Sequence, residues 1–520
     1  MQNSMAQTEV IIIGAGPTGL VLALWLTKLG VKARIVDKAA GPGTTSRALA
    51  VHARTLELYR QLDLNDVVIE RGHRVPAVNL WVGGERRARV SFEDAGADLT
   101  PYPFLHIFPQ DEHERLLISR LGAMGISVER RTELIGYADE GDRIIALLRR
   151  DGGKDEHCEA AYIAGCDGAH SRVREIMHEG FPGGTYQQIF YVADVEASGP
   201  SIDGELHVDL DEADFLAVFP LAGQGRARLI GTVRGERAER AETLCFGDVG
   251  GRAIDHMKVG VRKVNWFSTY RVHHRVSQRF RKGRAFVLGD SAHIHSPAGG
   301  QGMNTGIGDA INLAWKLQTV LEGRAPDALL DSYEAERIAF ARRLVKTTDR
   351  VFTLATAEGK LARLIRTRVI PLVLPAVANL HGWRKWLFRT VSQVMINYRG
   401  SILSEGTAGH VHGGDRLPWV RFENADNYAS LSTIAWQIHV YGTVSQALAE
   451  WCKEHELPLR VFPWRPEYAD AGLAQSALYL LRPDSYVALA DELGRVEVLQ
   501  AYFSKRRILP RSLTDGVRFG

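Results

Sequence analysis

Two segments of the chain contain residues that could bind an anionic ligand. One runs from Gly289 to Asn304 and combines an acidic residue, Asp290, with several glycines. The apolar run at 285–288 predicts a buried strand before it, and the pattern at 304–317 predicts a helix after it. Such a loop directs backbone N–H groups and the positive end of the helix dipole toward an anion. A tight turn between strand and helix would need the same glycines, so the choice between a turn and an anion site depends on a second segment.

That second segment lies near the N-terminus and has the pattern G-x-G-x-x-G. It follows the apolar strand predicted at 10–13 and precedes an apolar helix at 21–29 and a second strand that ends at Asp37. Gly14 allows the tight turn, Gly16 lets the backbone approach a pyrophosphate, and Gly19 lets the helix pack on the strand. Asp37 lies 23 residues after Gly14, where a carboxylate accepts hydrogen bonds from ribose hydroxyls. The residues expected to contact a dinucleotide here are Gly14, Ala15, Gly16, Pro17, Thr18, Gly19, Asp37 and Lys38.

Length and composition set the bounds of the function. A chain of 520 residues is too long for one core and predicts two or three domains. The net charge of +3 gives no reason to expect a nucleic acid partner. The four cysteines lack C-x-x-C or metal-ligand spacing, which favours a reducing, cytoplasmic compartment without a zinc site. The polar lead at 1–9 does not have the pattern of a signal peptide. The apolar patch at 369–377 holds two prolines and is too short to span a bilayer, so no stable membrane association is expected.

A third segment, Asp167-Gly168 within 164–174, completes a set of three motifs. In their order and spacing, the chain resembles the FAD-dependent aromatic hydroxylases, the class A flavoprotein monooxygenases with the p-hydroxybenzoate hydroxylase fold. The resemblance covers at least residues 8–350, and the C-terminal region resembles the phenol and polyketide hydroxylase branch. It implies an α/β fold with a Rossmann-type FAD-binding domain, an inserted antiparallel-sheet substrate domain and a C-terminal thioredoxin-like domain.

The resemblance also implies further cofactor contacts. Arg47 would lie over the flavin, Gln110 would meet the ribityl and phosphate portion, and Asp290 would bind the ribityl chain. Leu134 would contact adenine through its backbone, and the Pro297 loop would flank the path of a moving flavin. Apart from the G-x-G-x-x-G unit that ends at Asp37 and Lys38, the residues expected to contact the cofactor are Arg47, Gln110, Leu134, Asp167, Asp290, Pro297, Gly302, Met303 and Asn304. The backbone of the last three would meet the flavin pyrimidine ring, where N–H donors stabilise the charge of reduced flavin.

The reaction implied is hydroxylation of a phenolic or polycyclic aromatic substrate. NADPH or NADH reduces the flavin, oxygen adds to form a C4a-hydroperoxide, and one oxygen atom passes to the aromatic ring. The chain contains no second complete G-x-G-x-x-G and no C-x-x-x-x-C pair, which disfavours reductases of the glutathione reductase type. An epoxidase, a Baeyer–Villiger oxygenase, a halogenase and a flavoprotein without catalytic activity stay open as alternatives.

The expected domains are 1–176 and 276–350 for FAD, 177–275 for the substrate sheet, 351–400 for a helical linker and 401–520 for the thioredoxin-like domain. Strand patterns at 190–195, 205–209, 214–220 and 228–233 predict the sheet. On it, Phe215, Ala217 and Phe219 would form either a pocket wall or plain core. The thioredoxin-like domain lacks C-x-x-C, so we expect a structural or association role. A homodimer is left open.

The sequence does not identify a catalytic base. A base would help by deprotonating a phenol, because phenolate is the better nucleophile. The candidates are Tyr191, His207, Tyr270 and His52, each of which is more often structural. His293 and His295 have metal-like spacing but no acidic partner nearby beyond Asp290, so no metal is expected.

Overall fold

A largely parallel sheet forms the first part of the protein and brings several loops to one edge. The structure is a computed structural model that describes residues 6–43, 48–209, 215–233, 244–249, 251–295, 298–356, 381–423 and 425–510. The sheet has the strand order β17-β18-β11-β1-β2-β8, with β10 and β9 added beside β11. Ile13 of β1 pairs with Gly165 of β11, and Gly165 pairs with Val287 of β18, all in parallel. The loops that follow these strands are therefore neighbours.

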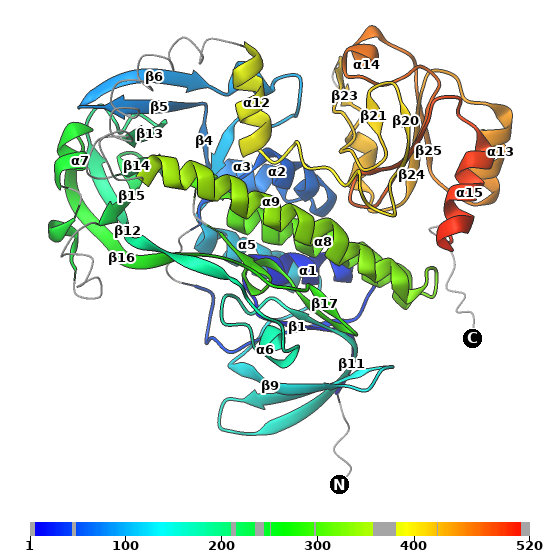
Figure 1. Cartoon of the computed structure of the whole chain (residues 1–520), viewed down its shortest axis with the longest axis horizontal. Coiled ribbons are helices and arrows are strands. Elements are labelled where there is room, and N and C mark those ends of the chain that lie inside the picture. The colour runs from blue at the N-terminus through cyan, green and yellow to red at the C-terminus, as the bar shows by residue number, and fades with distance from the viewer. Residues whose placement is uncertain are drawn as a thin grey trace.

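The strands of this sheet are β1 (Ala6–Ile13), β2 (Ala33–Asp37), β8 (Glu129–Arg130), β9 (Thr132–Asp139), β10 (Ile144–Arg150), β11 (Asp155–Gly165), β17 (Arg281–Lys282) and β18 (Ala285–Val287). The helices packed around it include α1 (Pro17–Lys28), α5 (Gln110–Ala123), α6 (Arg172–Ile176), α8 (Gln301–Leu321) and α9 (Asp331–Thr356). Figure 1 shows α8 and α9 running through the middle of the molecule. A further group holds α2 (Ala53–Tyr59), α3 (Asn65–Arg71), α4 (Glu93–Gly96) and the small sheet of β3 (Ala50–Val51), β7 (Leu105–Ile107) and β4 (His73–Val75).

A second sheet contains the four predicted strands and is larger than the sequence suggested. Its order is β19-β16-β12-β15-β14-β13-β5-β6. The strands are β5 (Ala77–Val82), β6 (Glu85–Ser91), β12 (Gly183–Ser198), β13 (Leu206–Asp209), β14 (Leu216–Pro220), β15 (Arg226–Val233), β16 (Gly260–Val276) and β19 (His293–Ile294), and α7 (Gly251–His256) packs on one face. The neighbours pair antiparallel except β13 and β5, which pair in parallel. The strands β5 and β6 come from residues that the sequence placed with the first sheet.

The third part, at the C-terminus, is a mixed sheet with helices around it. Within it β24 and β25 are parallel, while β26 pairs antiparallel with both β24 and β27, and α13 connects β24 to β25. This arrangement fits the expected thioredoxin-like unit, and the α/β fold class is confirmed. The elements are β20 (Glu405–Ala408), β21 (Val411–His412), β22 (Arg421–Phe422), β23 (Ala425–Asp426), β24 (Gln437–Tyr441), α13 (Gln446–Glu454), β25 (Leu459–Phe462), α14 (Pro466–Asp470), β26 (Leu478–Leu481), β27 (Val487–Asp491) and α15 (Val496–Arg506). The helix before them, α12 (His381–Val391), packs against α4 instead.

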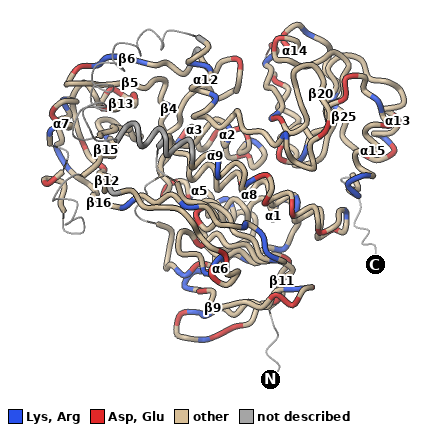
Figure 2. Tube along the Cα trace, viewed as in Figure 1, with Lys and Arg blue, Asp and Glu red and all other residues tan. Residues whose placement is uncertain are grey.

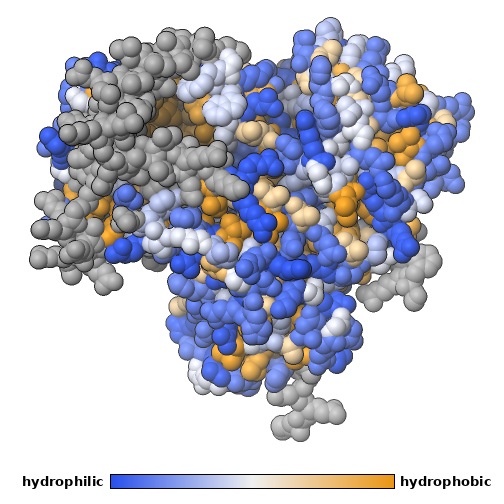
Figure 3. All heavy atoms as spheres, viewed as in Figure 1, coloured by the Kyte–Doolittle hydropathy of each residue, from blue (hydrophilic) through white to orange (hydrophobic). Residues whose placement is uncertain are grey.

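The surface carries both signs of charge. Figure 2 shows Lys and Arg interspersed with Asp and Glu along the described chain. The part of the surface coloured by hydropathy in Figure 3 is mostly hydrophilic, with hydrophobic residues in separate groups. None of the helices in the described residues combines the length and the apolar character needed to cross a membrane.

Candidate functional site

The three sequence motifs meet at the carboxyl edge of the parallel sheet. A Cβ atom at Gly14 would lie 2.3 Å from the carbonyl oxygen of Cys166, next to Asp167. A Cβ at Gly289 would lie 2.6 Å from the hydroxyl oxygen of Thr18. The chain therefore brings segments more than a hundred residues apart into van der Waals contact.

The first glycine loop is tight on one side and open on the other. Gly14 has a φ of 101°, which favours glycine, and a Cβ at Gly19 would lie 2.0 Å from the Gly14 carbonyl oxygen. At Gly16, by contrast, a Cβ would meet nothing within 4 Å. Gly16 also precedes α1 without a side chain to bond the N–H groups of its first turn, and Pro17 opens that turn. The open side of this loop thus offers the space and the N–H donors that a phosphate needs.

Asp37 lies beside this loop, at the end of β2. Its Oδ2 atom accepts a hydrogen bond from the Ala15 N–H at 2.7 Å, and its Oδ1 atom accepts one from the Ala39 N–H at 2.7 Å. Each carboxylate oxygen has capacity for another donor, so Asp37 can still bind a ribose hydroxyl. Lys38 is exposed next to it.

Asp167 joins its own motif to the segment from Gly289 to Asn304. Its Oδ2 atom accepts hydrogen bonds from the N–H groups of Arg172 and Val173 at the start of α6, and its Oδ1 atom accepts one from the Ser291 hydroxyl at 3.0 Å. The Ser291 hydroxyl oxygen in turn accepts the Gly168 N–H at 2.8 Å. The carboxylate of Asp167 therefore holds two loops together, and the start of α6 is satisfied by the chain itself.

The helix α8, at the end of the segment from Gly289 to Asn304, starts earlier than the sequence predicted. It begins at Gln301, because Gly299 and Gly300 adopt φ values of 75° and 62° that end the preceding turn. Gly302, Met303 and Asn304 therefore lie in its first turn. The Asn304 side chain is buried and bonds His52, Thr55, Ala50 and Gly300. The Asn304 side chain is therefore occupied, and its contact with the flavin pyrimidine ring stays a prediction for the backbone of this turn.

The remaining predicted contacts are spread over several elements. Asp290 is exposed, three residues after the end of β18. Gln110 is the first residue of α5 and donates a hydrogen bond to Glu114 at 2.8 Å, while Leu134 is buried in β9 beside a bulge. Arg47 and Pro297 lie outside the described residues.

Beside the site lie two buried charged residues that the sequence did not predict as part of it. Asp309 of α8 is fully buried and accepts hydrogen bonds from the Gly289 N–H at 2.9 Å and from His293 Nε2 at 2.7 Å. Arg337 of α9 pairs with the same carboxylate at 2.5 Å. His293 thus has a buried acidic partner, contrary to expectation, and it serves the loop structure. In the described residues, no three His, Cys, Asp or Glu side chains are grouped to hold a metal.

The faces of the second sheet separate the candidate catalytic residues. Phe215, Phe219 and Tyr270 are half-buried and pack against the core that contains α8, as does Met303. Tyr191 instead packs in the outer core with α7, and His207 bonds Trp81 of that core at 2.9 Å. Tyr191 and His207 therefore face away from the glycine loops, whereas Tyr270 is on the side that faces them.

His52 lies close to the start of α8 but is buried. Its Nε2 atom is 3.0 Å from the Gly300 carbonyl oxygen. Burial lowers the pKa of His52 to about 4, so its imidazole is neutral at pH 7. Its place under Gly300 indicates support for the turn before α8.

Together these residues fit FAD. The two helix starts without a side-chain cap, at Gly16 and Gly300, suit a pyrophosphate and the electron-rich edge of a flavin, and Asp37 and Asp290 suit hydroxyl groups. The half-buried aromatic residues of the second sheet suit a planar substrate.

Comparisons with known proteins also indicate FAD. The family model described as "FAD binding domain" matches residues 7–348. A 6-methylpretetramide 4-monooxygenase of Streptomyces rimosus is 32% identical over 98% of this chain and 95% of its own length. A flavin-dependent monooxygenase of Mycobacteroides abscessus is 31% identical over 94% of this chain and 98% of its own. The solved structure of the anhydrotetracycline hydroxylase OxyS of Streptomyces rimosus superposes with a TM-score of 0.76, at 26% identity, over 97% of this chain and all of that one. The chain therefore belongs to the FAD-binding family of flavoprotein monooxygenases that includes the aromatic hydroxylases.

Proposed function

We propose that this enzyme uses NADPH or NADH and oxygen to hydroxylate a polycyclic, phenolic substrate bound between α8 and the second sheet. The main support is the row of half-buried aromatic residues, Phe215, Phe219 and Tyr270, that packs against the same core as Met303. Relatives named for 6-methylpretetramide and anhydrotetracycline support a substrate of this class. FAD, when bound, supplies the chemistry of reduced flavin with oxygen.

The residues of the chain have distinct roles in this proposal. The glycine loop from Gly14 to Gly19 holds the pyrophosphate, and Asp37 binds the adenosine ribose. Asp290 binds the ribityl chain, and the first turn of α8 stabilises negative charge on the flavin. The proposal also keeps the other predicted contacts, namely Lys38, Arg47, Gln110, Leu134, Asp167 and Pro297. The aromatic side of the second sheet orients the substrate and excludes water.

We assign the domains as predicted, with 1–176 and 276–350 for FAD, 177–275 for substrate, 351–400 as linker and 401–520 as the C-terminal domain. Residues 77–91 add two strands to the substrate sheet. The four free cysteines support a reducing, cytoplasmic compartment. A homodimer is an assembly for size measurements to test.

Purified enzyme should oxidise NADPH or NADH faster when a substrate is present. We would test a panel of simple phenols and polycyclic naphthoquinols under oxygen and identify products by mass spectrometry. The proposal predicts stimulation by polycyclic compounds and a product that gains one oxygen atom on an aromatic carbon. A product with oxygen inserted into a carbon–carbon bond would favour a Baeyer–Villiger oxygenase. The absence of both stimulation and product across the panel would contradict the proposal.

A further inference from the structure

We propose that the C-terminal domain holds the flavin-binding turn at Gly289 in place, through Tyr398, Arg337 and Asp309. The inference rests on the proposed function in one respect, that this turn binds FAD. It gives a role to a domain that contains no C-x-x-C motif. The three residues act as positioning residues and touch neither substrate nor cofactor.

The first link joins Asp309 to the turn. Its carboxylate accepts the Gly289 N–H at 2.9 Å, directly before Asp290, and Gly289 has a φ of 56°. Burial opposes ionisation of Asp309, but Arg337 and His293 outweigh it and keep its pKa below the ordinary value. A buried, charged acceptor makes a stronger hydrogen bond than a neutral one. Asp309 therefore fixes the backbone from which the Asp290 side chain projects.

The second link is Arg337, whose three nitrogens all have partners. Its Nε atom donates to Asp309 at 2.5 Å, Nη2 donates to the Thr305 carbonyl at 3.0 Å, and Nη1 donates to the Tyr398 hydroxyl at 2.8 Å. Only 2% of the Arg337 surface is exposed. Because a guanidinium is rigid and planar, a shift of Tyr398 changes the geometry of the bond to Asp309.

The third link is Tyr398, which is held by the C-terminal domain. Its N–H donates to the Gly414 carbonyl at 2.7 Å, and its ring lies 4.5 Å from that of Tyr486. Tyr398, Tyr486 and Ile396 form a small buried cluster, against which Phe340 of α9 packs. The position of the Tyr398 hydroxyl therefore depends on this domain.

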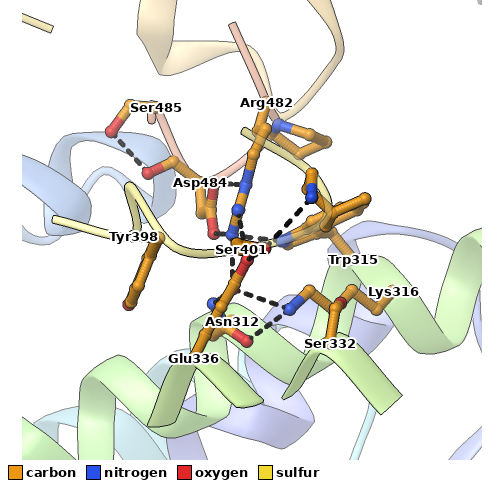
Figure 4. A network of polar contacts seen from close by, with 12 residues as sticks. Asn312, Trp315, Lys316, Ser332, Glu336, Tyr398, Ser401, Arg482, Asp484 and Ser485 are labelled. Atoms are coloured by element: carbon orange, nitrogen blue, oxygen red, sulfur yellow. Dashed lines mark hydrogen bonds and ion pairs between the residues drawn. The ribbon is translucent and has the colours of Figure 1, made fainter. Parts of the chain in front are cut away.

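A second network fixes the domain against α8 and α9. Glu336, next to Arg337, bonds Arg482 at 2.7 and 3.0 Å and Lys316 at 2.8 Å (Figure 4). Arg482 also pairs with Asp484, which accepts a hydrogen bond from Trp315 at 3.1 Å. Figure 4 shows these side chains converging from the two helices and from the strand-end segment at 482–485. Buried polar networks whose members all have partners are rigid, so this network holds the domain against α8 and α9.

The test separates positioning from general stability with matched tyrosine variants. Tyr398→Phe removes only the hydroxyl that Arg337 bonds, and a small cavity lined by Arg54, Arg337 and Tyr398 leaves room for water to replace it. The control is Tyr502→Phe, whose hydroxyl bonds the Leu403 carbonyl at 2.8 Å inside the C-terminal region. We would titrate each apoprotein with FAD and record the flavin absorption spectrum and the thermal midpoint.

We expect Tyr398→Phe to raise the FAD dissociation constant about three- to tenfold and to shift the flavin spectrum. The control should change the dissociation constant less than about twofold. Equal FAD affinity in wild type and Tyr398→Phe, or equal weakening in both variants, would overturn the inference. Asp290→Ala separates the two proposals: if it weakens FAD binding and Tyr398→Phe does not, only the positioning role of Tyr398, Arg337 and Asp309 is wrong. If Asp290→Ala keeps full affinity, the flavin site itself is wrong.

Discussion

Gly14→Ala is expected to abolish FAD binding and to destabilise the apoprotein by about 2–5 kcal/mol. The new Cβ would lie 2.3 Å from the Cys166 carbonyl oxygen and 2.9 Å from the Asp167 Cα atom, and both are backbone atoms that cannot rotate away. The φ of 101° would in addition be strained for alanine. FAD titration and chemical unfolding of the apoprotein measure the two effects.

Gly16→Ala is the matched control for this variant. Its Cβ would meet no atom within 4 Å, and its φ of −76° suits any residue. The apoprotein should lose at most about 1 kcal/mol, from the weaker helix cap. FAD affinity should still fall, because the methyl group points into the space assigned to the pyrophosphate. Equal destabilisation of the two apoproteins would mean that the open side of the loop has been wrongly assigned.

Glu336→Gln is expected to lower the free energy of unfolding by about 3–5 kcal/mol. The Glu336 carboxylate is 1% exposed and is shared by Arg482 and Lys316, with further hydrogen bonds from Asn312 and Ser401. A neutral amide would leave the buried Lys316 without its counter-charge, would leave Arg482 with Asp484 alone, and would turn a donor toward both cations. Thermal and urea unfolding, combined with proteolysis of the linker, would show whether the C-terminal domain is released first.

The control for Glu336 is Glu129→Gln. Glu129 also pairs with two arginines, Arg34 at 2.7 Å and Arg150 at 3.1 Å, but its side chain is 29% exposed. Solvent can replace the lost charge there, so the change should stay within about 1 kcal/mol. Similar losses of unfolding free energy in the two variants would show that burial of the Glu336 network adds no stability beyond that of an exposed ion pair.

The sequence predicts the flavin loops well because their requirements are local. Gly14, Gly16 and Gly19 each meet a steric condition of one turn, and Asp37 follows at a fixed distance along one strand–helix–strand unit. The edge of a parallel sheet then determines that the later motifs, at Asp167 and Asp290, join them. The start of α8 was misplaced by three residues because the left-handed pair Gly299 and Gly300 ends the turn earlier than the apolar pattern suggests.

The supporting residues are harder to predict because their partners are distant. Asp309 did leave a signal, since it is the only charge in the run Gly306-Ile307-Gly308-Asp309-Ala310-Ile311. Arg337 left none, because it stands beside Glu334 and Glu336 in a pattern typical of a solvated helix face. The parallel pairing of β13 with β5 joins residues 128 positions apart, such as Leu206 and Val78, and no local pattern specifies it.

The most direct test of the flavin site is FAD titration of the Asp290→Ala apoprotein. Asp290 is exposed at the edge where the three motifs meet, so its loss should leave the fold intact. We expect one FAD per wild-type chain and an affinity about 10- to 100-fold weaker in the variant, with the thermal midpoint of each apoprotein measured as the control for folding. FAD bound by Asp290→Ala as tightly as by the wild type would contradict the assignment of this site.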